Sequence, residues 1–122
     1  MMFYSPLRYP GGKGKLEPFM ELMIKKMNHV GGVYIEPFAG GAGIAMRLLE
    51  KGLVSDVVIN DLDKGIYSFW RAALSDTTRF LEEIMNVPLT MDEWRKQRNI
   101  CFNDNRKYSF ELGFATFYMN RT

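Results

Sequence analysis

The sequence has little of what most disulfide and metal sites require. It contains one cysteine, Cys101, and one histidine, His29, among 122 residues. A lone cysteine cannot form an intramolecular disulfide, and one cysteine with one histidine falls short of the ligand set of a zinc site. The sequence therefore predicts no metal site and a reducing, cytoplasmic location. It assigns no chemistry to His29.

Long apolar runs and a strong charge of one sign are lacking as well. No stretch approaches the roughly 18 consecutive apolar residues of a membrane span, and the opening residues have no signal-peptide core. A net charge of +2 is too weak to indicate a nucleic-acid partner by itself. With 47% hydrophobic and 14% aromatic residues, the chain has enough apolar material for one compact soluble domain. No repeat or linker-like segment predicts a domain boundary.

The spacing of apolar residues predicts alternating helices and strands in the first half of the chain. The consecutive apolar β-formers of the second strand favour a parallel sheet that is covered on both faces. The predicted order is a loop at Leu7–Lys15, a helix from Pro18 to Met27, a strand at Val33–Glu36, a helix with Ile44, Ala45, Leu48 and Leu49 on its apolar face, and a strand at Asp56–Asn60.

The second half predicts helices only. Two of them are expected to face the core, and the two tryptophans are expected to be core residues. The patterns are Ile66, Phe69, Trp70, Ala73 and Leu74; Phe80, Leu81, Ile84 and Met85; a capping box of Thr90 and Glu93 before a helix that runs to about Phe102; and Ser109 as the cap of a helix with Phe110, Phe114 and Phe117. The whole predicts an α/β protein whose parallel sheet is incomplete, because two strands leave open edges.

A glycine bend and an acid follow the two predicted strands. Gly40, Gly41 and Gly43 lie between the first strand and its helix, and Asp61 follows the second strand, 18 positions after Gly43 (61 minus 43). Glycine lets a ligand approach the backbone, and an acid roughly 20 residues further on is typical of ribose recognition. This pattern indicates a ribose-bearing cofactor. A ligand-free tight turn and a helix-capping aspartate remain the alternatives.

The order of residues in the bend favours one cofactor class. The run GGAGIA lacks the full GxGxxG that seats a pyrophosphate, so a nicotinamide dinucleotide is disfavoured. S-adenosylmethionine has a ribose and no phosphate. Its binding requires a backbone that the ligand can approach closely and an acid for the ribose, but no phosphate-binding site. It is therefore the cofactor that the bend favours.

Four blocks together resemble the Dam-type DNA adenine methyltransferases. They stand in the order RYPGGK at Arg8–Lys13, EPFAGGAG at Glu36–Gly43, NDLD at Asn60–Asp63 and FYMNRT at Phe117–Thr122. The resemblance implies a Rossmann-like, S-adenosylmethionine-dependent methyltransferase fold. It also implies methylation of adenine in double-stranded DNA, as in restriction–modification systems.

The resemblance implies a role for individual residues as well. Asp61 would accept the ribose hydroxyls, Leu62 would lie against the adenine, and Glu36 would meet the methionine ammonium. A solvated cation and a surface aromatic remain the alternatives for Lys13 and Tyr9, and the family often has tryptophan at the latter position. The cofactor-binding set is Tyr9, Gly12, Lys13, Phe38, Gly40, Gly41, Gly43, Asp61 and Leu62, with Gly11 beside Gly12.

The catalytic DPPY block of that family has no counterpart in this sequence. The five prolines stand at positions 6, 10, 18, 37 and 88, and no two are adjacent. In the family, that block and the target-recognition region follow the asparagine–arginine segment. The chain is therefore expected to be one cofactor-binding portion, residues 1–122, with no catalytic residue and no activity alone. A second chain that completes the sheet, a non-catalytic binding module and a substrate other than DNA remain open.

Basic residues gather in the last quarter of the chain. Acidic residues interrupt them, which favours a solvated helix face over a DNA-binding track. The basic residues are Arg95, Lys96, Arg98, Arg106 and Lys107, and the interrupting acids are Asp92, Glu93 and Asp104.

Overall fold

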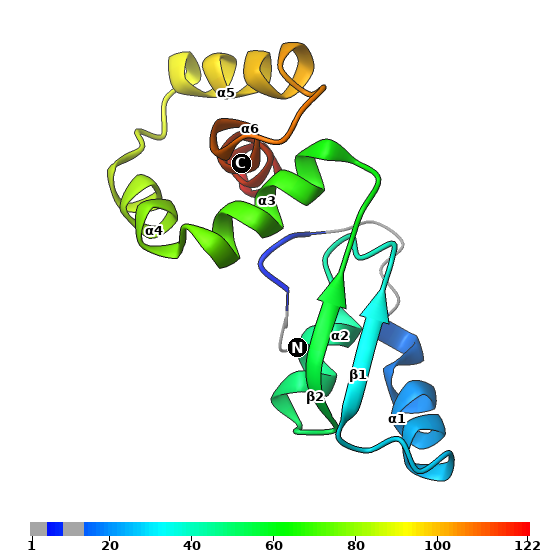
Figure 1. The fold of residues 1–122 in the computed structure, drawn as a ribbon. Coiled ribbons are helices and arrows are strands. Elements are labelled where there is room, and N and C mark those ends of the chain that lie inside the picture. Colours follow the sequence, from blue (N-terminus) through cyan, green and yellow to red (C-terminus); the bar gives the residue numbers. More distant parts are fainter. Residues whose placement is uncertain (1–4, 9–13) are drawn as a thin grey trace. The chain divides into compact units, whose positions relative to one another are not determined.

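The computed structural model describes residues 5–8 and 14–122 of the chain. Internal contacts divide the chain into two compact units, Met1–Asp61 and Leu62–Thr122, although the sequence predicts no boundary. The first unit contains η1 (Gly14–Leu16), α1 (Glu17–Lys26), β1 (Gly32–Glu36), α2 (Gly43–Glu50) and β2 (Val54–Ile59), and the second contains α3 (Lys64–Ser75), α4 (Thr77–Asn86), α5 (Met91–Asn103) and α6 (Phe110–Arg121) (Figure 1). These elements follow the predicted order.

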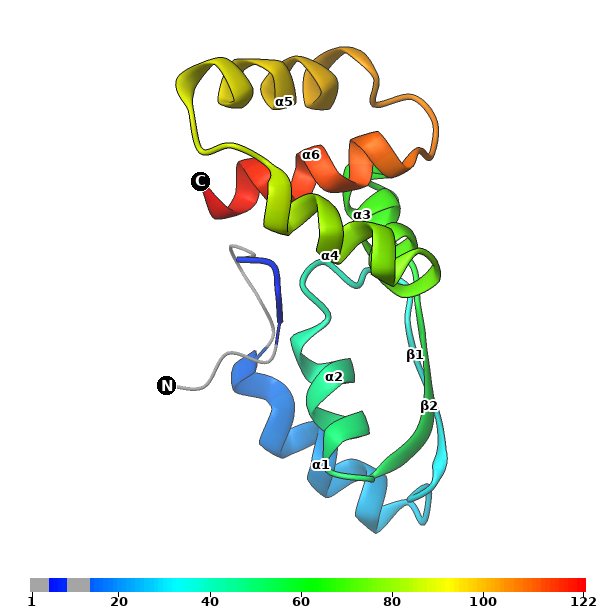
Figure 2. The same cartoon turned by 90° about the vertical axis from the view of Figure 1, so that its left-hand side faces the viewer.

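The first unit is a β–α–β arrangement with an added helix. β1 and β2 pair in parallel, with Ile35 opposite Val58, and α2 makes the crossover that a parallel pair requires. Both helices lie on the same face of the sheet (Figure 2). The side chains that these two helices pack against the sheet belong to one apolar cluster. It comprises Ile44, Leu48, Leu53 and Val54, with Met20, Ile24, Tyr34 and Val57 packed against it.

The opposite face of the sheet is exposed, so the predicted coverage of both faces is wrong for the described residues. Val33, Ile35 and Val58 are 58%, 65% and 51% exposed. Side chains alternate between the faces of a strand, and both helices of this unit pack on the other side. Leu49 of α2, which was predicted to belong to the apolar face, is likewise 40% exposed.

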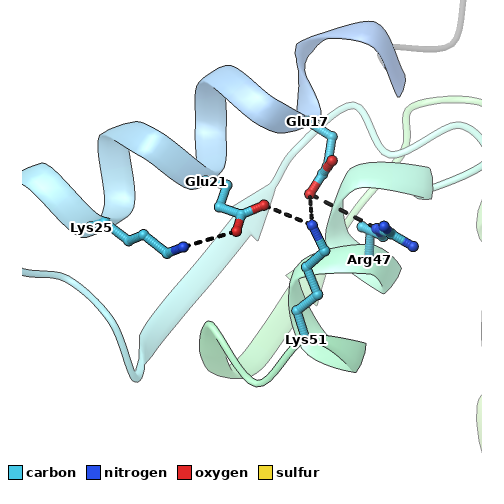
Figure 3. Close-up of polar contacts among 5 residues, drawn as sticks. All are labelled: Glu17, Glu21, Lys25, Arg47 and Lys51. Atoms are coloured by element: carbon cyan, nitrogen blue, oxygen red, sulfur yellow. Dashed lines mark hydrogen bonds and ion pairs between the residues drawn. The ribbon is translucent and has the colours of Figure 1, made fainter.

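Salt bridges join α1 to α2 and to Lys51, the residue that follows α2 (Figure 3). The Nζ of Lys51 lies 2.9 Å from Glu17 Oε1 and 2.7 Å from Glu21 Oε2. Glu21 also pairs with Lys25 at 3.0 Å, and Arg47 Nε lies 3.9 Å from Glu17. The acids of α1 thus meet cations of both helices.

An aromatic cluster forms the core of the second unit. The ring of Phe80 lies 5.7 Å from that of Phe69, 5.6 Å from that of Phe114 and 5.4 Å from that of Phe117. Trp70 is 7% exposed, which confirms it as a core residue. α3 and α6 pack closely because Gly113 has no side chain to meet the backbone of Ser68.

The helix caps of this unit confirm the sequence prediction, whereas the apolar face of α4 does not. Thr90 Oγ1 accepts a hydrogen bond from the Glu93 amide at 3.2 Å, and Ser109 Oγ accepts one from the Leu112 amide at 2.9 Å. On α4, Phe80 is buried, but Met85 is 83% exposed. α4 begins directly after Asp76 at the end of α3, so its first turn reaches the aromatic cluster and its later turns leave it. The other predicted core residues with substantial exposure are Leu74, Leu81 and Ile84.

Candidate cofactor site at the strand ends

Hydrogen bonds join the carboxyl ends of β1 and β2. The Asn60 amide donates to the carbonyl oxygen of Glu36 at 2.9 Å, and the Ala39 amide donates to the carbonyl oxygen of Asn60 at 2.8 Å. The side-chain amide of Asn60 donates to the Pro37 carbonyl at 3.3 Å. Asn60 therefore anchors the glycine bend after β1. Sequence reasoning missed this role, because nothing in the residue type distinguishes an anchoring asparagine from a solvated one.

Asp61 lies against the glycine bend. Its Oδ2 accepts a hydrogen bond from the backbone amide of Gly40 at 2.8 Å. The next acid along the chain, Asp63, is the N-cap of α3: its Oδ1 accepts from the amides of Gly65 at 2.8 Å and Ile66 at 3.1 Å. The capping role, which was the alternative for Asp61, thus belongs to Asp63.

The bend has an unusual backbone. Gly40 and Ala42 both have a φ of +50°, in the left-handed region that glycine adopts freely and alanine does not. The alanine costs about 1 kcal/mol of backbone strain, and such strain gathers at functional sites. Ala42 is also the N-cap residue of α2 and carries no side-chain cap. The start of α2 therefore presents backbone N–H groups beside the bend.

Glu36 ends β1 on the buried face of the sheet. It is 8% exposed, and its Oε2 accepts a hydrogen bond from the Tyr34 hydroxyl at 2.9 Å. Burial, together with this hydrogen bond and the carboxylate charge, raises the pKa of Tyr34 to about 12. The tyrosine therefore stays protonated and holds one oxygen of the Glu36 carboxylate.

The other predicted residues have varied environments. Phe38 is 69% exposed, whereas Gly41 is buried in the bend. Gly43 begins α2, and a β-carbon there would meet nothing within 4 Å, so packing does not require glycine at this position. Leu62 is 81% exposed and begins the second unit. Tyr9, Gly11, Gly12 and Lys13 lie outside the described residues.

The described part of the chain contains no group of His, Cys, Asp and Glu side chains arranged to hold a metal ion. None of the helices in residues 5–8 and 14–122 has the length and apolar character needed to span a membrane.

The bend and its acid occur within a sequence that matches a known family. The family profile of the D12 class N6 adenine-specific DNA methyltransferases matches residues 9–111. The chain belongs to this family. The predicted relationship to adenine-specific DNA methyltransferases is thereby confirmed.

One curated relative adds detail. The chain is similar to the Type II methyltransferase M.MjaIII of Methanocaldococcus jannaschii, with 28% identity over 96 residues. The match covers 75% of this chain and 33% of the relative, so the chain spans about a third of the length of the curated methyltransferase. No solved structure matches the chain.

Proposed function

We propose that the first unit binds S-adenosylmethionine at the bend after β1, and that the complete methyltransferase transfers its methyl group to adenine in double-stranded DNA. The observation that carries this proposal is the contact between Asp61 Oδ2 and the Gly40 amide at 2.8 Å. It brings an acid and a glycine bend to the ends of adjacent parallel strands, where cofactors bind in open α/β sheets.

The contact suits Asp61 to ribose recognition. A carboxylate has two oxygens with about four acceptor sites, so Asp61 can accept from Gly40 and from ribose hydroxyls together. The hydrogen bond to Gly40 also fixes the orientation of the carboxylate before a ligand arrives. The Gly40 amide is engaged by Asp61, so the cofactor would meet other donors of the bend and of the start of α2.

The remaining residues of the proposed site carry supporting roles. The exposed ring of Phe38 offers an apolar face, and Glu36 offers a carboxylate to the methionine ammonium. Leu62 would lie against the adenine, and Tyr9, Gly12 and Lys13 would close over the cofactor. The bound cofactor supplies an activated methyl group on sulfur. The chain's own residues bind and orient it, and none of them is proposed as catalytic.

The affinity of Asp61 variants for S-adenosylmethionine tests the site. We expect calorimetry to show binding to the unmodified chain and at least about tenfold weaker binding to Asp61→Ala, because one hydrogen bond to a charged group is worth about 1.5–3 kcal/mol. Asp61→Asn should fall between the two, since it keeps one acceptor. Asp56→Ala removes an exposed acid from β2 and should bind like the unmodified chain. Equal heats from the unmodified chain and Asp61→Ala, or no heat from either, would overturn the proposal.

The second candidate is a non-catalytic module that holds the cofactor or a partner chain. The absence of adjacent prolines favours it, because the family's DPPY block then has no counterpart among these residues. A methylation assay with the purified chain and adenine-containing duplex DNA tests this candidate. Turnover would exclude the non-catalytic module. Cofactor binding without turnover is the result that both candidates expect of this chain.

A further inference from the structure

Four cations of the second unit lie together without acidic partners. We call them, with the two tyrosines between them, the basic surface: Lys64, Tyr67 and Arg71 on α3, and Arg106, Lys107 and Tyr108 in the loop between α5 and α6. All four cations are exposed. Within the described part of the chain, no carboxylate forms an ion pair with any of them.

The helical repeat and one loop bring these residues to the same place. Lys64, Tyr67 and Arg71 are spaced i, i+3 and i+7, so they form one stripe along α3. Tyr108 packs its ring edge-on against Tyr67 with centroids 6.2 Å apart. The Ser109 amide donates to Ser68 Oγ at 3.4 Å, which holds the loop, orange in Figure 1, against α3. The two residues before Tyr108 are Arg106 and Lys107.

The tyrosines hold Arg71 in a defined orientation. Its guanidinium carbon lies 4.7 Å from the ring centre of Tyr108, and its Nη1 donates to the Tyr67 hydroxyl at 3.2 Å. The hydrogen bond with Tyr67 raises the pKa of Arg71 further, so the group is charged at every working pH. Lys64 Nζ lies 5.8 Å from the ring centre of Tyr67. A planar guanidinium fixed in this way is suited to bidentate recognition of a phosphate.

Three other cations of this unit have acidic partners. Arg79 pairs with Glu111 at 3.1 Å and with Asp76 at 3.7 Å. Arg95 pairs with Asp92 at 3.3 Å, and Lys96 lies 4.0 Å from Glu93. Of the basic residues that the sequence groups together, Arg95 and Lys96 thus have acidic partners, and Arg98 lies 4.9 Å from the ring centre of Phe102. Arg106 and Lys107 form no ion pair with a described residue. Like charges placed together repel one another, so ion pairing within the fold does not explain why these cations lie together.

We infer that the basic surface binds the phosphate backbone of duplex DNA during methyl transfer. The inference rests on the proposed function, since it assigns a binding surface for the same DNA. Surface lysines and arginines with tyrosine hydroxyls are the groups that contact phosphates and position a protein on a duplex. A protein partner fits less well, because lysine is depleted at the centre of protein interfaces and this surface has no buried apolar anchor.

Salt-dependent binding of a labelled duplex to the full chain tests this inference. Arg106→Gln/Lys107→Gln and the control Arg95→Gln/Lys96→Gln each remove two positive charges. Each phosphate contact contributes about 0.9 to the slope of log affinity against log salt concentration, so we expect the first pair to lower that slope by about 2. The control pair should leave the slope unchanged. Circular dichroism should show the same helix content for both, since all four side chains are exposed.

Three results would overturn the inference: equal slope losses for the two pairs, an unchanged slope for Arg106→Gln/Lys107→Gln, or no binding of duplex DNA by the unmodified chain. Calorimetry with S-adenosylmethionine on the same samples separates this outcome from failure of the proposed function. Cofactor binding that depends on Asp61, without DNA binding that depends on Arg106 and Lys107, refutes the basic surface alone. An altered slope without cofactor binding refutes the cofactor site alone.

Discussion

Asp61 and Asp63 are two residues apart in the sequence and accept hydrogen bonds from different parts of the chain. Asp61 accepts from the amide of the Gly40 bend, 21 positions earlier, whereas Asp63 accepts from two amides of the helix that it begins. The local pattern of a polar residue before a helix applies to both. Only the pairing of β1 with β2 decides which acid reaches the bend, so the sequence alone left the capping alternative open.

The hydrogen bond between Asp61 and the bend should contribute measurably to the free energy of unfolding. Asp61→Ala removes the hydrogen bond between the Gly40 amide and the carboxylate, which costs about 1–3 kcal/mol of the free energy of unfolding. Urea unfolding followed by circular dichroism measures this loss. Asp56→Ala, at an exposed position of β2, is the matched control and should change the value by less than about 0.5 kcal/mol. A cost as large in the control would show that the contact is not what stabilises the bend.

Cys101 should react slowly while the chain is folded. Burial raises the pKa of its thiol, and the charge of Asp63 acts in the same direction, whereas a hydrogen bond with Thr116 acts against them. Because the thiolate is the nucleophile, a raised pKa lowers the reactive fraction near neutral pH. We expect alkylation by iodoacetamide at pH 7.5 to be slower in the native chain than in the same chain unfolded in urea. Equal rates would contradict the half-buried position of this side chain.

At the scale of elements, the link between α1 and α2 should depend on pH. Hydrogen bonds from Lys51 and then Lys25 lower the pKa of Glu21 from 4.5 to about 2. A lowered pKa in the folded state adds stability that is present above about pH 4.5 and is lost as the pH falls towards 2. Glu21→Gln should therefore lower the urea midpoint at pH 6 and have little effect near pH 2.5. The effect should be small and weaker in high salt, because the groups are near the surface.

Glu50→Gln supplies the control for that experiment. Glu50 is an exposed acid at the end of α2, and no ion pair joins it to another described residue. Its variant should show the same pH dependence as the unmodified chain. If Glu21→Gln and Glu50→Gln behave alike between pH 2.5 and 6, the network of Figure 3 does not join the two helices in solution.

Two glycine-to-alanine substitutions should differ in their effect on the free energy of unfolding. A β-carbon on Gly113 would lie 2.6 Å from the carbonyl carbon of Ser68, so Gly113→Ala must push α6 away from α3, which costs about 1–3 kcal/mol. A β-carbon on Gly43 would meet nothing within 4 Å, so Gly43→Ala should be neutral or gain up to about 1 kcal/mol through helix propensity. Thermal or urea unfolding measures both changes. A neutral Gly113→Ala would contradict the close packing of these helices.

The difference between local patterns and contacts between elements explains what the sequence could predict. The strands, the helices and the caps at Thr90 and Ser109 follow from local patterns, and they occur as predicted. Coverage of the second face of the sheet and burial of α4 were predicted wrongly, because they depend on which elements meet. The anchoring role of Asn60 escaped prediction for the same reason: its partners lie at the end of β1 and in the bend that follows it. The proximity of Asp61 to the bend was predictable, since the ends of adjacent parallel strands share one edge.

At the scale of the whole molecule, the division into two units falls between Asp61 and Leu62. It therefore cuts through a block that resembles a single motif of the methyltransferase family. The junction NDLDKG, Asn60–Gly65, contains no proline and only one glycine, which is why composition predicts no linker there. The proposed cofactor residues, except Leu62, belong to the first unit, and the basic surface belongs to the second. The two proposals thus concern separate units, and variants in one can serve as controls for the other.

The aromatic core of the second unit should be sufficient for folding of that unit alone. A peptide of residues 62–122 contains every ring of the cluster around Phe80, together with the caps of α3, α5 and α6. We expect it to show helical circular dichroism and a cooperative urea transition. Phe80→Ala in this peptide should remove about 3–5 kcal/mol, enough to abolish the transition, because the ring contacts four other aromatic rings. Met85→Ala, on the exposed side of the same helix, should leave the transition in place. A peptide that is unfolded without substitution would show that the second unit needs the first one in order to fold.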